Sequence, residues 1–174
     1  MAISLYDATV LGFIQSLSGA TIFLERGYNH FTDNGVDLNE ITQARLFPDM
    51  LPFSFQVHNI AHHSMGAVKG AKQGIFSPSA GDPNADYRAL QAEVATALEA
   101  LKAVKPEDIN ALEGKDVTFQ IGDRKMPFTA ENFLLSFSIP NLHFHATTAY
   151  DILRTKGVPL GKRDYMGMPR MKMG

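Results

Sequence analysis

The chain alternates long segments, in which apolar residues recur at helical spacing, with short polar segments that stop a helix. The first helix is predicted from a cap at Ser4 or Asp7 to about Thr32, where an Asp-Asn-Gly sequence ends it. Short helical turns are expected at Leu38–Arg45 and after Pro106. Three further long helices are predicted at about residues 49–73, 85–104 and 130–156. Four long helices of this kind favour a helical bundle.

The last predicted helix carries an apolar strip with steps of three and four residues, as on the core face of a bundle helix. The strip consists of Leu135, Ile139, Leu142, Ala146, Ala149 and Leu153. Pro140 interrupts the helix because its ring clashes with the carbonyl group of Ser136, so we expect a kink there.

Residues before the last helix alternate with the period of a β-strand. Val117–Ile121 and Arg124–Phe128, joined at Gly122-Asp123, predict a small β-hairpin that packs on the helices. The predicted fold is therefore mainly all-α, a four-helix bundle with a β-hairpin before the last helix. We expect one bundle domain at residues 1–160, followed by a Met-rich, basic C-terminal tail at residues 161–174.

Charge is distributed unevenly along the chain. Three stretches contain no Lys, Arg, Asp or Glu: Ala8–Leu24, Met50–Val68 and Asn132–Tyr150. Their polar residues and prolines argue against membrane spans and favour buried helices of a soluble protein. The formal net charge of −2 gives no electrostatic case for a nucleic-acid partner. Met1–Asp7 lacks the positive region of a secretory signal, so we expect a cytoplasmic protein.

The absence of cysteine excludes disulfides, thiolate metal sites and a cysteine nucleophile. A transition-metal site would therefore use His, Asp, Glu or water. Five of the six histidines lie in the uncharged stretches. His58 and His62 are four residues apart, so both project from one face of the second helix and could chelate one ion. His145 on the last helix is the candidate third ligand, with His143 in reserve.

The surroundings of the histidine pair predict which way it faces. Leu51, Phe55 and Met65 lie in line with His58 and His62, so this mostly apolar face is expected to point inward. The next residue, His63, lies about 100° away around the helix and is not part of the pair.

Hydrogen-bonded core or cleft histidines are the alternative to a metal site. A pair four residues apart is weakly specific without the Glu of the H-E-x-x-H motif, and no carboxylate lies near these histidines in the sequence. In this alternative, a polar and aromatic cleft binds a small molecule. Its candidate ligand contacts are Asn141, His143 and Tyr150.

Several motifs occur in order along the chain and together resemble a known family. They are Ser4-Leu5-Tyr6-Asp7, Ala44-Arg45-Leu46, Pro48-Asp49-Met50, Phe55-Gln56-Val57, Phe133-Leu134-Leu135, Pro140-Asn141, residues 145–154 and residues 157–162. The sequence resembles an uncharacterised family, described only as a domain of unknown function, within the DinB/YfiT-like metalloenzyme superfamily. The resemblance covers about residues 4–165. It implies a DinB-like four-helix bundle that is frequently homodimeric.

The resemblance also implies where a metal would bind. Metal-binding members of the superfamily use one His on the second helix and a pair of His four residues apart late in the domain. In this sequence the four-apart His pair lies on the second helix instead, and the two His of the last helix are two residues apart. Of the candidate ligands, only His145 stands at a position where the closer family typically has His.

The sequence indicates two alternative functions. The favoured one is a small-ligand-binding module or a homodimeric interaction module, with a degraded metal site. The alternative is a hydrolase or transferase that depends on a divalent metal. In that alternative His58, His62 and His145 hold Ni²⁺ or Zn²⁺, and metal-bound water is the nucleophile.

Overall fold

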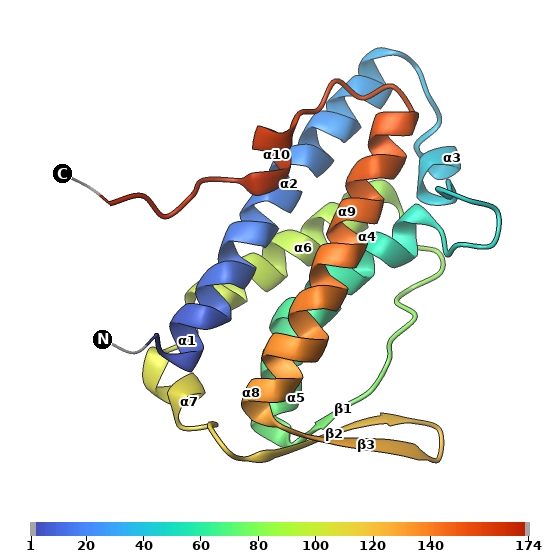
Figure 1. Cartoon of the computed structure of the whole chain (residues 1–174). Helices are drawn as coiled ribbons and strands as arrows, with labels where there is room; N and C mark the ends of the chain where they lie inside the picture. The colour runs from blue at the N-terminus through green and yellow to red at the C-terminus, as the bar shows by residue number, and fades with distance from the viewer. Residues whose placement is uncertain (1–2, 173–174) are drawn as a thin grey trace.

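The computed structural model describes residues 3–172, which form a four-helix bundle with a small sheet across one end (Figure 1). The predicted fold class is therefore confirmed. The first bundle helix consists of α1 (Leu5–Ala8) and α2 (Val10–Asp33), and the third of α6 (Tyr87–Lys102). The second contains α4 (Phe53–Ala61), the π-helical segment η1 (His62–Gly66) and α5 (Ala67–Gln73). The last contains α8 (Ala130–Asn132), the π-helical segment η2 (Phe133–Ser138) and α9 (Ile139–Thr155).

Short helices connect or follow these long ones. They are α3 (Leu38–Thr42), α7 (Pro106–Asn110) and α10 (Lys162–Met166). The predicted start signals act as expected, because the side chains of Ser4, Asp37 and Thr129 accept hydrogen bonds from backbone N–H groups at the starts of α1, α3 and α8. The second bundle helix begins after Pro52 rather than near residue 49.

The two π-helical segments change which residues face the core. A π-turn places one extra residue in the turn, so the helix face beyond it is displaced. In the last bundle helix the buried positions are Leu134, Ser138 and Leu142, whereas Leu135 is 42% exposed. The predicted core strip is thus wrong at Leu135 and correct from Leu142 onward. Pro140, where we expect a kink, is the second residue of α9 and follows this π-segment.

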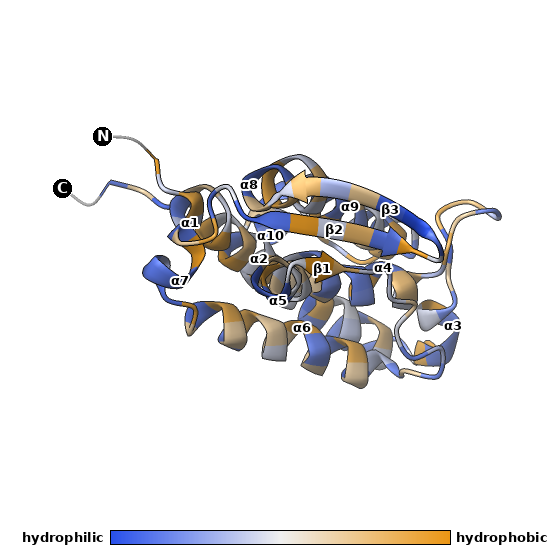
Figure 2. Cartoon of the chain, turned by 90° about the horizontal axis from the view of Figure 1, so that it is seen from below, coloured by the Kyte–Doolittle hydropathy of each residue, from blue (hydrophilic) through white to orange (hydrophobic). Residues whose placement is uncertain are grey.

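The sheet has three strands in the order β1-β2-β3, one more than the sequence predicts. Strands β2 (Asp116–Ile121) and β3 (Arg124–Thr129) form the expected antiparallel hairpin. The additional strand, β1 (Ile75–Phe76), lies between the long helices predicted at residues 49–73 and 85–104 and pairs in parallel with β2. Figure 2 shows the strands lying side by side next to α5 and α8. The two-residue length of β1 explains why no alternating pattern marks it.

The first bundle helix is a core helix. The stretch Leu5–Asp33 is long and apolar enough to cross a membrane by length and composition alone. In the bundle, however, α2 packs against α6 and α9 and buries Phe13, Leu17 and Phe23 almost completely. Core helices of soluble proteins pass the same test of length and composition.

The segment predicted as a tail, residues 161–174, begins with a helix that packs on the bundle. Helix α10 lies against α2 (Figure 1). Arg26 of α2 forms a 2.7 Å ion pair with Asp164 and donates a hydrogen bond to the Pro159 carbonyl oxygen. Gly19 lets the two backbones approach, because a Cβ atom there would collide with the carbonyl group of Tyr165.

This close approach predicts that Gly19→Ala releases α10 while the bundle stays folded. Overpacking costs about 1–3 kcal/mol, so we expect trypsin to cleave after Lys162 and Arg163 about tenfold faster or more. The measurement is limited proteolysis followed by mass spectrometry. Gly12→Ala in the same helix is the matched control, because no atom lies within 4 Å of the added Cβ. Equal cleavage rates for the two variants would contradict the proposed docking of α10.

Candidate functional site

The second bundle helix turns His63 toward the interior, rather than His58 and His62. The side chains of Val57, Ile60 and His63 are buried, and His63 is 6% exposed. His58 and His62 are only partly buried, on the side that carries the 49% exposed Leu51. The predicted inward face is therefore wrong. The buried strip instead follows Phe53, Val57, Ile60, Ser64 and Val68, with His63 beside it in the π-segment.

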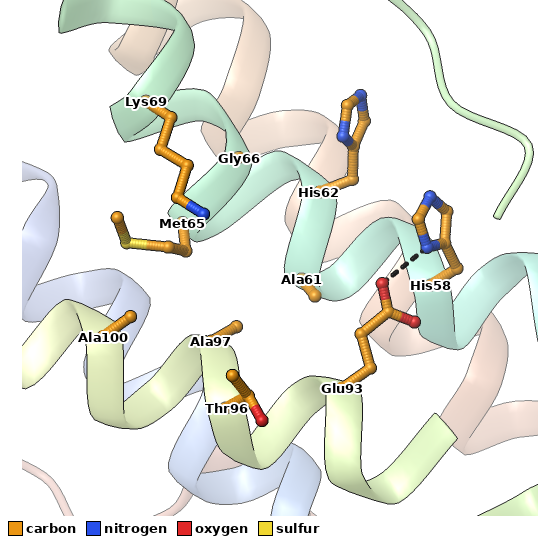
Figure 3. A pocket seen from close by; sticks show the side chains of 10 residues that line it. All are labelled: His58, Ala61, His62, Met65, Gly66, Lys69, Glu93, Thr96, Ala97 and Ala100. Atoms are coloured by element: carbon orange, nitrogen blue, oxygen red, sulfur yellow. Dashed lines mark hydrogen bonds and ion pairs between the residues drawn. The ribbon is translucent and has the colours of Figure 1, made fainter. Parts of the chain in front are cut away.

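His58 is held between a carboxylate and a hydroxyl group. Its Nδ1 lies 2.7 Å from Oε1 of Glu93 on α6, as Figure 3 shows, and its Nε2 lies 2.8 Å from Oγ of Ser79. Because a carboxylate only accepts hydrogen bonds, Nδ1 carries the proton in the neutral ring. The lone pair of Nε2 then accepts the hydroxyl proton of Ser79. The carboxylate that the local sequence lacks is thus supplied by the third bundle helix.

His62 is held by the same loop, residues 77–81. Its Nε2 donates a hydrogen bond of 2.8 Å to the Ser77 carbonyl oxygen. Its ring stacks on Phe76 with 4.4 Å between the ring centroids. The rings of His58 and His62 are parallel and 5.7 Å apart, so the predicted pair does share one helix face. Together the two histidines fasten the loop to the second bundle helix.

His145 of α9 faces His63 of η1. The two rings stack with 5.6 Å between centroids. Nδ1 of His145 lies 2.8 Å from Oε1 of Gln56, while Gln56 donates its own amide to the Leu51 carbonyl oxygen. That second bond leaves Oε1 as the acceptor, so Nδ1 of His145 is the donor and its Nε2 keeps a lone pair. Nδ1 of His63 is buried without a hydrogen-bond partner in the described chain.

These two rings line a cleft of about 570 Å³ between α4, α9 and the sheet. Its remaining walls are aromatic side chains, loop residues and the amides of Asn59 and Asn141. The lining residues are Phe55, Asn59, Phe76, Pro78, Ser79, Ala80, Phe119, Phe137 and Asn141, together with His63 and His145. Ligand pockets commonly have volumes of about 300–1,000 Å³ and combine apolar walls with a few convergent polar groups. The cleft has both properties.

A second, smaller hollow of about 340 Å³ lies between the second bundle helix and α6, with His58 and His62 among its lining residues. Figure 3 shows small side chains, Ala61, Ala97 and Ala100, where the two helices face each other, with Glu93 reaching across to His58. Small residues at these positions leave the hollow open.

Burial keeps the cleft histidines neutral. It lowers the pKa of His63 to about 3, with the neighbouring His62 and His145 acting in the same direction. Burial likewise lowers the pKa of His145 to about 4. The pKa of His62 is also lowered by burial, although its bond to the Ser77 carbonyl oxygen opposes the shift. At pH 7 His63 and His145 therefore present neutral rings to the cleft.

The predicted ligand set does not converge on one point for a metal ion. Within residues 3–172, no group of three or more His, Asp or Glu side chains is arranged to hold one ion. Both ring nitrogens of His58 are engaged by Glu93 and Ser79, and His145 lies with His63 rather than with the pair. The donors present do not fit a Ni²⁺ or Zn²⁺ ion held by His58, His62 and His145, and we derive no step through a metal.

The remaining predicted residues lie in different places. Asn141 lines the cleft and donates a hydrogen bond to the Phe137 carbonyl oxygen. The side chain of His143 is exposed. Tyr150 makes edge contacts with Phe23 and with Tyr165 of α10, away from the histidine cleft. Of these three candidate ligand contacts, the structure brings only Asn141 to the cleft.

Comparison with known proteins identifies the family. A model of the family described as domain of unknown function DUF1993 matches residues 5–166. The chain belongs to this family. The DUF1993 chain is also similar to the crystal structure of a DinB family member protein from Shewanella denitrificans, with 25% sequence identity and a TM-score of 0.77. The match covers 98% of this chain and 96% of that one. A search among curated proteins gave no significant match.

The expected resemblance to a family of unknown function with a DinB-like fold is thus confirmed. The DUF1993 structure also shows a spacing that attention to histidine alone missed. Asn141 and His145 are four residues apart on the last helix, both line the cleft, and His63 of the second helix lies opposite. A search for any polar pair four residues apart could have found it.

The lowered pKa values predict that acid destabilises the fold through the cleft histidines. Below the unfolded-state pKa of about 6.5, the two rings are protonated in the unfolded chain but stay neutral in the native protein. The free energy of unfolding therefore falls as the pH falls toward their native pKa values. Between pH 7 and pH 5 each ring should contribute a loss of about 2 kcal/mol. Urea unfolding at the two pH values measures it.

His63→Asn removes one of these groups. Over the same pH interval its free energy of unfolding should therefore fall by about 2 kcal/mol less than that of wild type. His143→Asn, which changes a more exposed ring, is the matched comparison. Burial also lowers the pKa of His143, so this variant should show the same direction of change but a smaller one than His63→Asn. A wild-type pH dependence in His63→Asn would show that His63 is not buried as a neutral ring.

Proposed function

We propose that this DUF1993 protein binds a small, largely apolar molecule in the cleft between α4, α9 and the sheet. The observation that supports it most directly is the unpartnered Nδ1 of His63, buried beside an open aromatic cleft. A buried polar atom without a hydrogen bond costs about 1–3 kcal/mol. Because this nitrogen has almost no accessible surface, the His63 ring must turn toward the cleft for a ligand to bond to it and recover that cost.

The chemistry of the cleft indicates the kind of ligand. Four Phe side chains line it, which favours an aromatic or branched apolar body. No Lys, Arg, Asp or Glu is among its lining residues. The neutral rings of His63 and His145 offer acceptor nitrogens, so a hydroxyl or amide N–H on the ligand is the complementary group. A small aromatic alcohol has this combination.

The prediction can be tested with 2-naphthol as the probe, by NMR titration of labelled protein. At about 0.3–0.5 kcal/mol for each heavy atom, its dissociation constant should lie between about 0.1 and 5 mM. Naphthalene, which lacks the donor, should bind about fivefold to tenfold more weakly. Shifts should concentrate at Asn59, Asn141 and the backbone of residues 77–81.

His145→Phe removes one acceptor but keeps the cleft apolar, so it should weaken 2-naphthol binding about tenfold. His143→Phe changes an exposed ring two residues away and should bind the probe like wild type. Binding that is equal in both variants, or shifts confined to other surfaces, would count against the cleft.

We also propose that the chain forms a homodimer through an exposed apolar surface at one end of α4 and α9. Phe47, Leu51 and Phe144 are 64%, 49% and 56% exposed. Gln56 links the Leu51 backbone to α9, because it bonds both to the Leu51 carbonyl oxygen and to the ring of His145, the neighbour of Phe144. Exposed aromatic side chains of this size are characteristic of interfaces.

Phe144→Ser should therefore shift the dimer toward monomer. Loss of a central aromatic residue costs about 2 kcal/mol, equivalent to a roughly thirtyfold weaker dimer. Analytical ultracentrifugation at micromolar concentration measures the change, with Ile121→Ser on the hairpin, 51% exposed, as the control. A wild-type monomer under these conditions would refute the dimer.

The cytoplasmic location, without nucleic-acid or membrane partners, remains part of this proposal. It is supported by the net charge of −2 and by the burial of the apolar side chains of α2 in the bundle core.

A further inference from the structure

We propose that Ser79, His58 and Glu93 form a catalytic triad that hydrolyses an ester whose apolar part occupies the cleft. The inference rests on the ligand cleft proposed above for its substrate, and on an independent geometry for its chemistry. The three side chains come from the loop after β1, from α4 and from α6, so no local sequence motif brings them together.

The distances are those of a nucleophile, a base and an orienting carboxylate. Oγ of Ser79 lies 2.8 Å from Nε2 of His58, and Nδ1 of the same ring lies 2.7 Å from Oε1 of Glu93. Such a triad is recognised by geometry and roles rather than by the order of its residues in the chain. The acceptor carboxylate fixes the proton on Nδ1, so Nε2 is free to take the hydroxyl proton of Ser79.

The loop is shaped around the His58 ring. Gly81 has a φ angle of +70°, and a Cβ atom there would lie 2.7 Å from Cγ of His58. The N–H of Gly81 donates a 3.3 Å hydrogen bond to Oγ of Ser79, which still leaves a lone pair on that oxygen for attack. The bond from His62 to the Ser77 carbonyl oxygen fixes the loop two residues earlier.

Ser79 also lines the aromatic cleft, so the nucleophile of the triad lies at the proposed ligand site. His58 and Glu93 line the separate hollow between the second bundle helix and α6. Within the cleft, Asn59 donates one amide N–H to the Phe55 carbonyl oxygen, which leaves its second N–H for an ester carbonyl oxygen. The substrate class is an ester or thioester with a small aromatic or branched apolar group.

The reaction consumes one water molecule for each ester and needs no other co-reactant. Oγ of Ser79 attacks the carbonyl carbon while its proton passes to Nε2 of His58. The bond between that carbon and the leaving oxygen or sulfur breaks, and His58 returns the proton to the leaving group. Water then attacks the acyl ester of Ser79, and its proton reaches Ser79 through His58. The products are a carboxylic acid and an alcohol or thiol, and Glu93 orients the ring throughout.

The test uses the full chain with a fluorophosphonate probe and with 2-naphthyl acetate, whose product 2-naphthol is fluorescent. We expect a single covalent adduct, placed on Ser79 by peptide mass spectrometry, and hydrolysis above the buffer rate. Ser79→Ala should lose both. His58→Gln should lower the hydrolysis rate about 10²–10⁴-fold, as expected for loss of a general base.

Ser136→Ala is the matched control, because its hydroxyl group bonds to the Asn132 carbonyl oxygen within the last bundle helix and does not line the cleft. It should react like wild type. Glu93→Gln, which keeps an acceptor but no charge, should retain the fold and react at least about tenfold more slowly. Absence of an adduct on wild-type Ser79, or equal hydrolysis by wild type and Ser79→Ala, would overturn the proposal.

The two proposals fail separately in these measurements. Binding of 2-naphthol in the cleft without an adduct on Ser79 would support the ligand site and overturn the catalytic triad. An adduct on Ser79 without binding of 2-naphthol would support Ser79 as the nucleophile and show that the cleft is not its substrate site.

Discussion

An extra residue in each of two helical turns controls which side chains enter the cleft. The π-segments His62–Gly66 and Phe133–Ser138 lie on the two helices that form its walls. The first carries His63 in the buried face, and the second shifts the buried strip so that Asn141 and His145 stand opposite it. Regular helices in both places would favour Leu135 inside. Single-turn π-segments are frequent at functional sites, which agrees with their position here.

Neighbouring protein groups fix three of the histidines of this cluster. Glu93 and Ser79 hold His58, the Ser77 carbonyl oxygen holds His62, and Gln56 holds His145. Each partner selects one tautomer. The same set of bonds fastens the loop 77–81 over the second bundle helix, so loop position, ring orientation and the exposure of Ser79 in the cleft are coupled. Neutral, buried rings and aromatic walls then favour an uncharged ligand.

Helix spacing, caps and the hairpin were predictable because they depend on local sequence. Asp37 and Thr129 cap as expected, and β2 and β3 pair as their alternation indicates. The site was less predictable, since it depends on contacts between distant segments. Residues 58 and 93 are 35 apart and residues 58 and 79 are 21 apart, so no spacing rule joins them. The register shift of a π-turn also leaves no periodic signal, so the sequence pattern predicts neither the burial of His63 nor the exposure of Leu135.

The most direct test of this account is the tautomer of each ring, measured by long-range ¹⁵N–¹H NMR at alkaline pH without added metal. The hydrogen bonds described predict the proton on Nδ1 in His58 and His145 and on Nε2 in His62. A His58 proton on Nε2, or shifts typical of metal-bound nitrogen, would contradict the account, because Nε2 of His58 would then be unable to accept the proton of Ser79.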